Sequence, residues 1–158
     1  MIIYCDGGHK QKISKDEAWG SVTDEKGVDL IPIYKDLFKD MNLKKVNLPS
    51  RGPAIIIISK FDDVKIQQNN GAELMAMIAS LRIACHIAKF KCDDRVNEIR
   101  CDSDLICKYW SKGKYSSTKL SKEKIHWINE CTTLRTLFEG KIVKISGKDN
   151  IADLFDSH

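Results

Sequence analysis

The sequence has neither a long apolar run nor the features of an export signal. Charged residues make up 30% of its 158 residues, and no apolar run approaches the length of a membrane span. The opening residues 1–6 lack both the basic start and the long apolar stretch of a secretory signal. We therefore expect an intracellular protein, cytoplasmic or nuclear, that is not secreted and does not bind a membrane.

Close cysteine pairs with the spacing of zinc ligands are also absent. The six cysteines are scattered, several of them among apolar residues, at positions 5, 85, 92, 101, 107 and 131. This pattern predicts reduced thiols that pack as small hydrophobic residues, and neither disulfides nor zinc ligands. No motif supports nucleophilic chemistry around His9, His86 or His126, so we interpret these histidines as structural or surface residues.

The chain has no internal repeat, and its length fits one domain over residues 1–158. Apolar patterns and turn residues predict strands at 1–6, 18–23, 54–59, 98–102 and 141–146, with 28–34 as a possible continuation of the first hairpin. They predict helices at 71–89, 103–110 and 120–138, and one or two helical turns at 151–156. The basic segment 35–53 is interpreted as an insertion.

This alternation of strands and helices is typical of an α/β domain. We expect a five-stranded mixed sheet with helices on both faces. The first long helix has apolar residues at helical spacing along one side, and Asn70 is its expected N-cap.

Four acidic residues occupy positions that an α/β fold can bring together. Asp6 and Asp102 end two strands, Glu73 opens the first long helix, and Asp153 lies in the last helical turn. Ligands of open α/β sheets bind at the carboxyl ends of strands. Oxygen ligands without histidine or thiol partners suit Mg²⁺ or Mn²⁺, and a cation would offset the repulsion among four carboxylates.

Each acid also has a purely structural interpretation. Glu73 and Asp153 both stand three residues after an asparagine, as acids in the first turn of a capped helix do. Asp6 precedes two glycines and could be a turn residue. No single acid favours a metal site, but the joint placement of the four does.

The order of these motifs resembles the type 1 ribonuclease H family along nearly the whole chain. The most specific match is residues 69–76, because the first long helix of that family opens with the same asparagine pair and Glu-Leu sequence. The other matching segments are residues 4–8, 18–20, 102–104 and 150–154.

The resemblance implies a ribonuclease H-like fold and an endonuclease that hydrolyses the RNA strand of RNA/DNA hybrids with two Mg²⁺ ions. Asp6 would bridge both ions, Glu73 and Asp102 would complete one site, and Asp153 would serve the other. Backbone groups of Gly7 and Gly8 would approach the RNA, and Asn69 and Asn70 would contact the hybrid.

A run of lysines is the expected contact with the hybrid backbone. Residues 108–124 hold six lysines and one acid, beside the pair Tyr109 and Trp110. We expect Lys112, Lys114 and Lys119 to face phosphates, although most lysine clusters are ordinary solvated surface.

The resemblance leaves two rival functions open. One is another nuclease of the same superfamily, such as a junction resolvase or an integrase core, and the other is a non-catalytic module that binds hybrids. The asparagine pair before Glu73 favours ribonuclease H, and retention of all four acids argues against a silent module. Many relatives carry a histidine in the loop before the last acid. This loop, residues 146–149, has none, so we expect Mn²⁺ to substitute for Mg²⁺.

Overall fold

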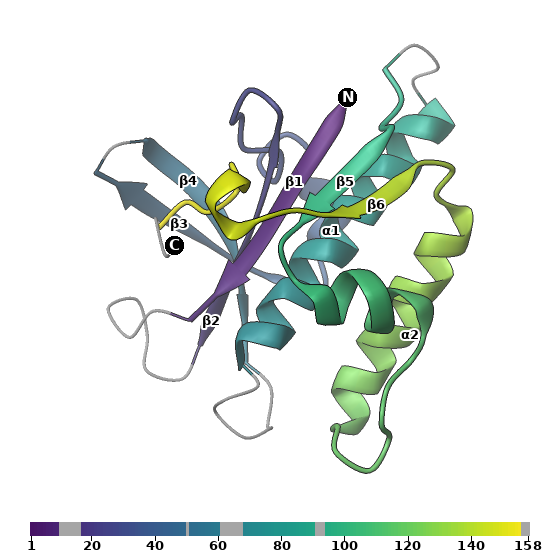
Figure 1. The fold of residues 1–158 in the computed structure, drawn as a ribbon. Helices are drawn as coiled ribbons and strands as arrows, with labels where there is room; N and C mark the ends of the chain where they lie inside the picture. The colour runs from purple at the N-terminus through teal and green to yellow at the C-terminus, as the bar shows by residue number, and fades with distance from the viewer. Residues whose placement is uncertain (10–16, 50, 61–67, 91–93, 156–158) are drawn as a thin grey trace.

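Six strands form one mixed sheet in the order β3-β4-β2-β1-β5-β6 (Figure 1). The structure is a computed structural model that describes residues 1–9, 17–49, 51–60, 68–90 and 94–155. The strands are β1 (Ile2–Gly8), β2 (Ala18–Asp24), β3 (Asn42–Leu48), β4 (Gly52–Ser59), β5 (Glu98–Cys101) and β6 (Lys141–Lys144). β5 is parallel to β1 and β6, whereas the pairs β1–β2, β2–β4 and β3–β4 are antiparallel. The expected mixed α/β sheet is confirmed, with one strand more than predicted.

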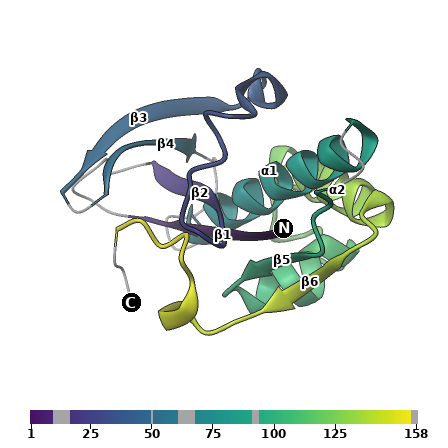
Figure 2. The ribbon, with the colours of Figure 1, turned by 90° about the horizontal axis from the view of Figure 1, so that it is seen from above.

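The two long helices lie on the same side of this sheet. They are α1 (Gln68–Phe90) and α2 (Lys122–Leu137), and short helical segments occur at η1 (Lys35–Phe38), η3 (Leu105–Tyr109), η4 (Trp110–Lys112) and η5 (Gly147–Asp149). In the view of Figure 2, α1 and α2 lie above β1 and β5, whereas the C-terminal segment after β6 runs below β1. That segment forms turns at residues 151–155 where one or two helical turns were expected.

The main core lies between α1 and the sheet. The α1 side chains of Leu74, Ile78 and Leu81 are fully buried there, together with Ile3 of β1 and Ile99 of β5. These three α1 side chains lie along one side of the helix, but Met75, Ala79 and Ile83 on the opposite side are buried as well. The helix is therefore buried nearly all round, and the prediction of a single buried face was wrong.

By length and mean hydropathy alone, Asn70–Phe90 could cross a membrane, although the sequence was expected to hold no apolar run of that length. Most of this stretch is buried inside the fold, as in the central helix of a core. Its apolar character is therefore explained by packing against the sheet and α2.

The inserted segment is part of the sheet. It contributes η1, edge strand β3 and the start of β4, and the antiparallel pairing of β3 with β4 extends from Asn42 to Leu48. Lys44 and Lys45 are exposed on β3, as charged residues on edge strands commonly are. Arg82 of α1 ties the insertion to the helices, because its guanidinium pairs with Asp40 at 2.7 Å and with Glu130 of α2 at 2.8 Å.

Two local predictions were wrong. Residues 28–34 do not form a strand: a single bridge joins Asp29 to Thr23, and the Asp29 carboxylate accepts hydrogen bonds from the backbone N–H groups of Ile31 and Ile55. Asn70 is not the N-cap of α1, because the helix already includes Gln68. The helix therefore begins at least two residues before the predicted cap.

Candidate metal centre

Three predicted acids converge at one edge of the sheet. Asp6, Glu73 and Asp102 each place a carboxylate oxygen so that the three atoms lie within 4.8 Å of one another. Asp6 is in β1, and Asp102 directly follows β5, which pairs with β1 in parallel. Because parallel strands bring their carboxyl ends to the same edge, these two acids meet there, and α1 adds Glu73 near its beginning.

Gly7 allows α1 to sit directly on the strand that carries Asp6. A Cβ atom at position 7 would lie 2.5 Å from the backbone nitrogen of Glu73 and 2.6 Å from the carbonyl carbon of Ala72. Its partner across the strand pair, Gly20, is similarly close to the helix, where a Cβ would lie 3.1 Å from the Ala72 oxygen. A larger residue at position 7 would push Glu73 away from Asp6.

The two predicted RNA-contacting glycines thus have packing roles. The space where a side chain of Gly7 would lie is filled by α1, and a Cβ at Gly8 would lie 3.0 Å from the Trp19 ring. These contacts explain the glycines without a ligand, and contact of Gly7 and Gly8 with RNA stays a prediction.

The cluster is electrostatically strained without a cation. Burial, together with the negative charges of Asp102, Asp153 and Glu73, raises the pKa of the Asp6 carboxyl to about 8, and a hydrogen bond from the Gly7 amide partly opposes this rise. Burial likewise raises the pKa of Glu73 to about 7, with a contribution from the charge of Asp102. A hydrogen bond from the Ser103 hydroxyl partly opposes that rise. Both acids therefore hold protons near neutral pH when no cation is bound.

Asp153 approaches from the C-terminal segment. Its side chain is buried, and its charge acts on Asp6, but it is not one of the three acids whose oxygens lie within 4.8 Å of one another. Two hydrogen bonds hold this segment against the sheet: the Ser21 hydroxyl donates to the Ala152 carbonyl, and the Asn150 amide donates to the Cys5 carbonyl at 3.0 Å.

Asn150 and Ser103 are site residues that sequence reasoning missed. Besides its bond to Cys5, the Asn150 amide donates to the Asp102 carboxylate at 3.2 Å and so links the C-terminal segment to the three acids. Ser103 bonds Glu73. The sequence signal for each was its position inside a family motif, 150–154 or 102–104, but nothing local indicated its partner.

The donor set fits a hard divalent cation. Both side-chain oxygens of Asp6 are buried, and among the described residues neither makes a hydrogen bond of ordinary geometry. A buried carboxylate without such partners is costly, and a cation held by Asp6, Glu73 and Asp102 would remove that cost. Oxygen ligands of this kind suit Mg²⁺ or Mn²⁺.

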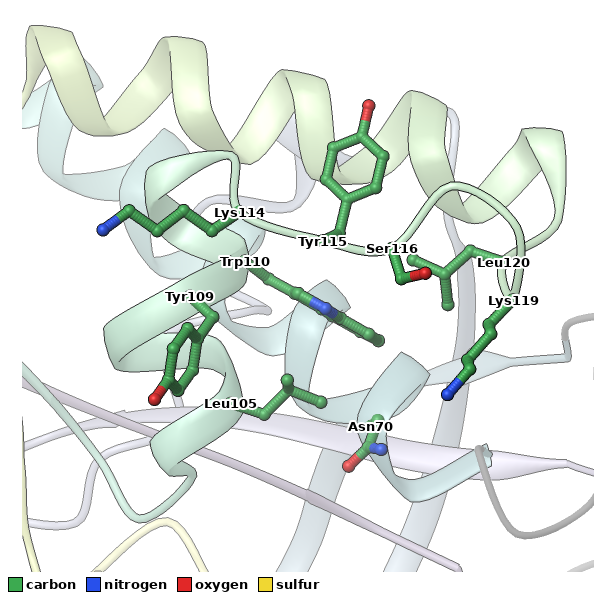
Figure 3. A pocket seen from close by; sticks show the side chains of 9 residues that line it. All are labelled: Asn70, Leu105, Tyr109, Trp110, Lys114, Tyr115, Ser116, Lys119 and Leu120. Carbon is green, nitrogen blue, oxygen red and sulfur yellow. The ribbon is translucent and has the colours of Figure 1, made fainter.

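A pocket of about 520 Å³ lies beside this centre (Figure 3). It lies between the beginning of α1 and the chain that connects η3 to α2. Its lining is mainly aromatic and apolar, with two lysines: Asn70, Leu105, Tyr109, Trp110, Lys114, Tyr115, Ser116, Lys119 and Leu120. Asn70 stands one helical turn before Glu73, so the pocket and the acids share one edge of the fold.

The predicted lysines do not all face this pocket. Figure 3 shows the Lys119 side chain directed toward Asn70, whereas Lys114 extends away from the pocket centre. Lys112 is exposed and does not line it, and Lys124 is buried against the Trp110 ring, so Lys124 is not part of a lysine surface. Asn69 lies in the first turn of α1, and its side chain lies outside the described part of the structure.

None of the described cysteines or histidines belongs to the three-acid group. The five described cysteines are free, and Cys92 lies outside the described residues. Two of the histidines pack against aromatic rings, His86 against Phe90 and His126 against Trp127.

Comparisons with known proteins do not establish a family for this chain. No family model matches the chain, and no curated protein is significantly similar to it. Among solved structures, it is similar to RNase H1 from the halophilic archaeon Halobacterium salinarum, with 18% identity, a TM-score of 0.49, and coverage of 96% of this chain and 89% of that one. It is also similar to LC11-RNase H1, isolated from compost by a metagenomic approach, with 25% identity, a TM-score of 0.46, and 96% and 89% coverage.

The compost protein has also been solved in complex with an RNA/DNA hybrid. That structure matches with 23% identity, a TM-score of 0.47, and coverage of 94% of this chain and 87% of that one. Because all these TM-scores are below 0.5, the α/β assignment rests on the sheet, and the candidate metal centre rests on the positions of the acids.

Proposed function

We propose that this chain is a metal-dependent ribonuclease H that hydrolyses the RNA strand of RNA/DNA hybrids. The observation that carries the proposal is the convergence of Asp6, Glu73 and Asp102, with both Asp6 oxygens buried and lacking ordinary hydrogen bonds. The resemblance of the motifs to type 1 ribonucleases H supplies the substrate class.

The residues of the centre have separate tasks in this proposal. Asp6, Glu73 and Asp102 would hold one divalent ion, and Asp6 together with Asp153 would hold a second. When bound, such ions generate hydroxide and stabilise the leaving 3′ oxygen during in-line displacement.

Neighbouring groups keep these acids in place. The Asn150 amide orients the Asp102 carboxylate, and the Ser103 hydroxyl does the same for Glu73. Such outer partners fix the orientation of metal ligands. Because α1 packs directly on Gly7, the Glu73 backbone lies against β1 and the spacing of the acids is set before substrate binds.

The aromatic pocket would receive the hybrid beside the metal centre. Exposed aromatic rings such as that of Tyr109 stack on bases, and lysines attract phosphates. Asn70 lines this pocket and stands one turn before Glu73 in α1. A strand bound there would therefore pass the three acids.

One set of assays tests this function against its rivals. The purified protein is incubated with labelled RNA/DNA hybrid, duplex RNA, duplex DNA and a four-way junction, in Mg²⁺, in Mn²⁺ and in chelator. We expect cleavage of the RNA strand of the hybrid alone, with either metal, and none in chelator. Cleavage of the junction or of duplex DNA would indicate a different nuclease of the superfamily, and hybrid binding without cleavage would indicate a silent module.

A further inference from the structure

A second pocket, of about 260 Å³, adjoins the metal centre from the other side. Its lining includes Arg51, Lys148 and Asp149, and it shares Asn150 and Asp153 with the centre. Arg51 precedes β4 in the inserted segment, and Lys148 lies in η5. The insertion therefore extends to the segment that carries the fourth acid.

Arg51 makes one contact that fixes its position. Its Nη1 atom donates a hydrogen bond to the Ile151 carbonyl at 2.9 Å, across 100 positions of sequence. A guanidinium has five N–H donors in a planar fork. In the described part of the chain this is its one hydrogen bond to protein, and no described carboxylate lies within ion-pair distance of it. Donors thus stay available to a ligand in the pocket.

The charges of the pocket favour an anion beside a metal. Lys148 is exposed and, among the described residues, forms no ion pair. Asp149 and Asp153 are the opposing charges, and the proposed function assigns Asp153 to a metal ion, which would offset its repulsion of an anion. A planar guanidinium and an ammonium together match the oxygens of a phosphate.

We propose that Arg51, assisted by Lys148, binds a backbone phosphate of the cleaved strand next to the metal centre. This inference rests on the proposed function and deepens it, because it names a substrate contact on the Asp153 side. It also gives the inserted segment a role, because the connection between β3 and β4 places Arg51 where the cleaved nucleic-acid strand would pass the acids.

The test couples one protein change to one substrate change. Hybrid binding is measured by fluorescence anisotropy in Ca²⁺, and cleavage is measured in Mg²⁺, for the parent, Arg51→Ala and Arg51→Lys. The set of hybrids carries an uncharged methylphosphonate at one position at a time. For Arg51→Ala we expect binding weaker by roughly tenfold or more, a rise in KM with a small change in kcat, and a salt slope lower by about one.

The coupling identifies the phosphate. Neutralising one particular linkage should weaken binding by the parent and have no further effect on Arg51→Ala, as expected for two partners of one contact. Arg51→Lys should keep the salt slope of the parent and recover part of the affinity, because it keeps the charge and loses the fork. Arg95→Ala is the matched control. Arg95 is an exposed arginine that precedes β5 and pairs with Glu139, and the variant should bind the hybrid as the parent does.

Each failure has its own meaning. A parent that does not cleave the hybrid overturns the proposed function. A parent that cleaves, with Arg51→Ala binding at unchanged affinity and slope, overturns this inference alone. Loss of kcat and thermal stability in Arg51→Ala, without coupling to any linkage, would mean that Arg51 only anchors Ile151, and that result also overturns the inference.

Discussion

The two sides of the metal centre are built by different means. On the side of α1, the helix is pressed onto the sheet through Gly7 and Gly20, and apolar packing fixes Glu73. On the C-terminal side, Asp153 belongs to a segment of turns held by hydrogen bonds from Ser21, Asn150 and Arg51, and by a smaller apolar cluster in which Leu154 packs with Trp19. Packing distributes its stabilisation over many atoms, whereas each hydrogen bond here can be removed by one substitution. Removal of one hydrogen-bonding side chain on the C-terminal side should therefore disturb that side and leave the packing of α1 unchanged.

Asp6 is where the two sides meet, so its substitution should have the largest effect. Asp6→Asn removes the proposed shared ligand of both ions, and we expect cleavage to fall by at least about a thousandfold. The protein should stay folded, because the amide is close in shape to the acid. Hydrolysis of a uniform hybrid in Mg²⁺ and the thermal unfolding curve measure the two effects.

Asp36→Asn is a suitable control, since Asp36 is exposed in η1. It should cleave as the parent does. Near-normal activity of Asp6→Asn would contradict the assignment of the centre. Asp153→Asn should also reduce cleavage, and a variant as fast as the parent would remove the second ion from the mechanism.

Asn150→Ala should have the next largest effect and should act where the C-terminal segment meets Asp102. The change leaves the Cys5 carbonyl without its donor and frees the Asp102 carboxylate. Loss of such an outer partner typically costs ten- to a hundredfold in metal affinity or activity, and an unpaired buried carbonyl costs about 1–3 kcal/mol.

Metal titration by calorimetry and denaturant unfolding measure these two effects. Asn129→Ala, an exposed position on α2, is the control and should leave both quantities unchanged. Parent-like metal affinity in Asn150→Ala would show that the geometry of the metal ligands does not depend on the Asn150 amide.

The sequence predicted the α1 side of the centre better than the C-terminal side. Gly7 and Glu73 belong to local patterns, a strand end and a helix start, that can be read within a few residues. The bond from Asn150 to Asp102 joins residues 48 positions apart, and no local pattern reveals its partner. The contact of Arg51 was still harder to predict from the sequence, because Arg51 and Ile151 are 100 positions apart.

The errors in the fold have similar causes. Strand β3 was not predicted, because its segment is basic and amphipathic and is followed by Pro49 and Pro53. An edge strand tolerates such polar residues, and β3 is at the edge of the sheet. Residues 28–34 looked like a strand, but Asp29 bonds the backbone of Ile31 and Ile55 and turns the chain instead. In both cases tertiary contacts overrode the local pattern.

The pH dependence of stability tests the α1 side of the centre, because the raised pKa values belong to Asp6 and to Glu73 of α1. In the metal-free protein these carboxyls have pKa values of about 8 and about 7, above the range near 4 of an unfolded chain. The native state therefore binds more protons than the unfolded state between about pH 4 and 8, so stability is full below that window and falls as pH rises through it.

We expect the metal-free protein to lose on the order of a few kcal/mol of stability between pH 5 and 9. Denaturant unfolding in chelator measures this loss. Saturating Mg²⁺ should oppose it, since the ion displaces the protons, and cleavage should rise toward alkaline pH. The Asp6→Asn variant serves as the control and should show a flatter profile. A metal-free parent whose stability rises over this range would contradict the charge crowding of the centre.

The smallest effects should come from the lysines on the α1 side. If the aromatic pocket receives the hybrid, Lys119, which points toward Asn70, should meet a phosphate more directly than Lys114, which extends outward, and Lys112 should contribute least. We expect Lys119→Ala to lower the salt slope of hybrid binding by about one, Lys114→Ala by less, and Lys112→Ala by little.

Binding titrations at several salt concentrations in Ca²⁺ give these slopes, with Lys39→Ala, an exposed lysine just after η1, as the control. Because thermal stability should not change in any of these variants, a lower slope reports a lost phosphate contact and not a disturbed fold. Equal slopes for Lys119→Ala and the parent would mean that the lysines are solvated surface and that the hybrid follows another path past Glu73.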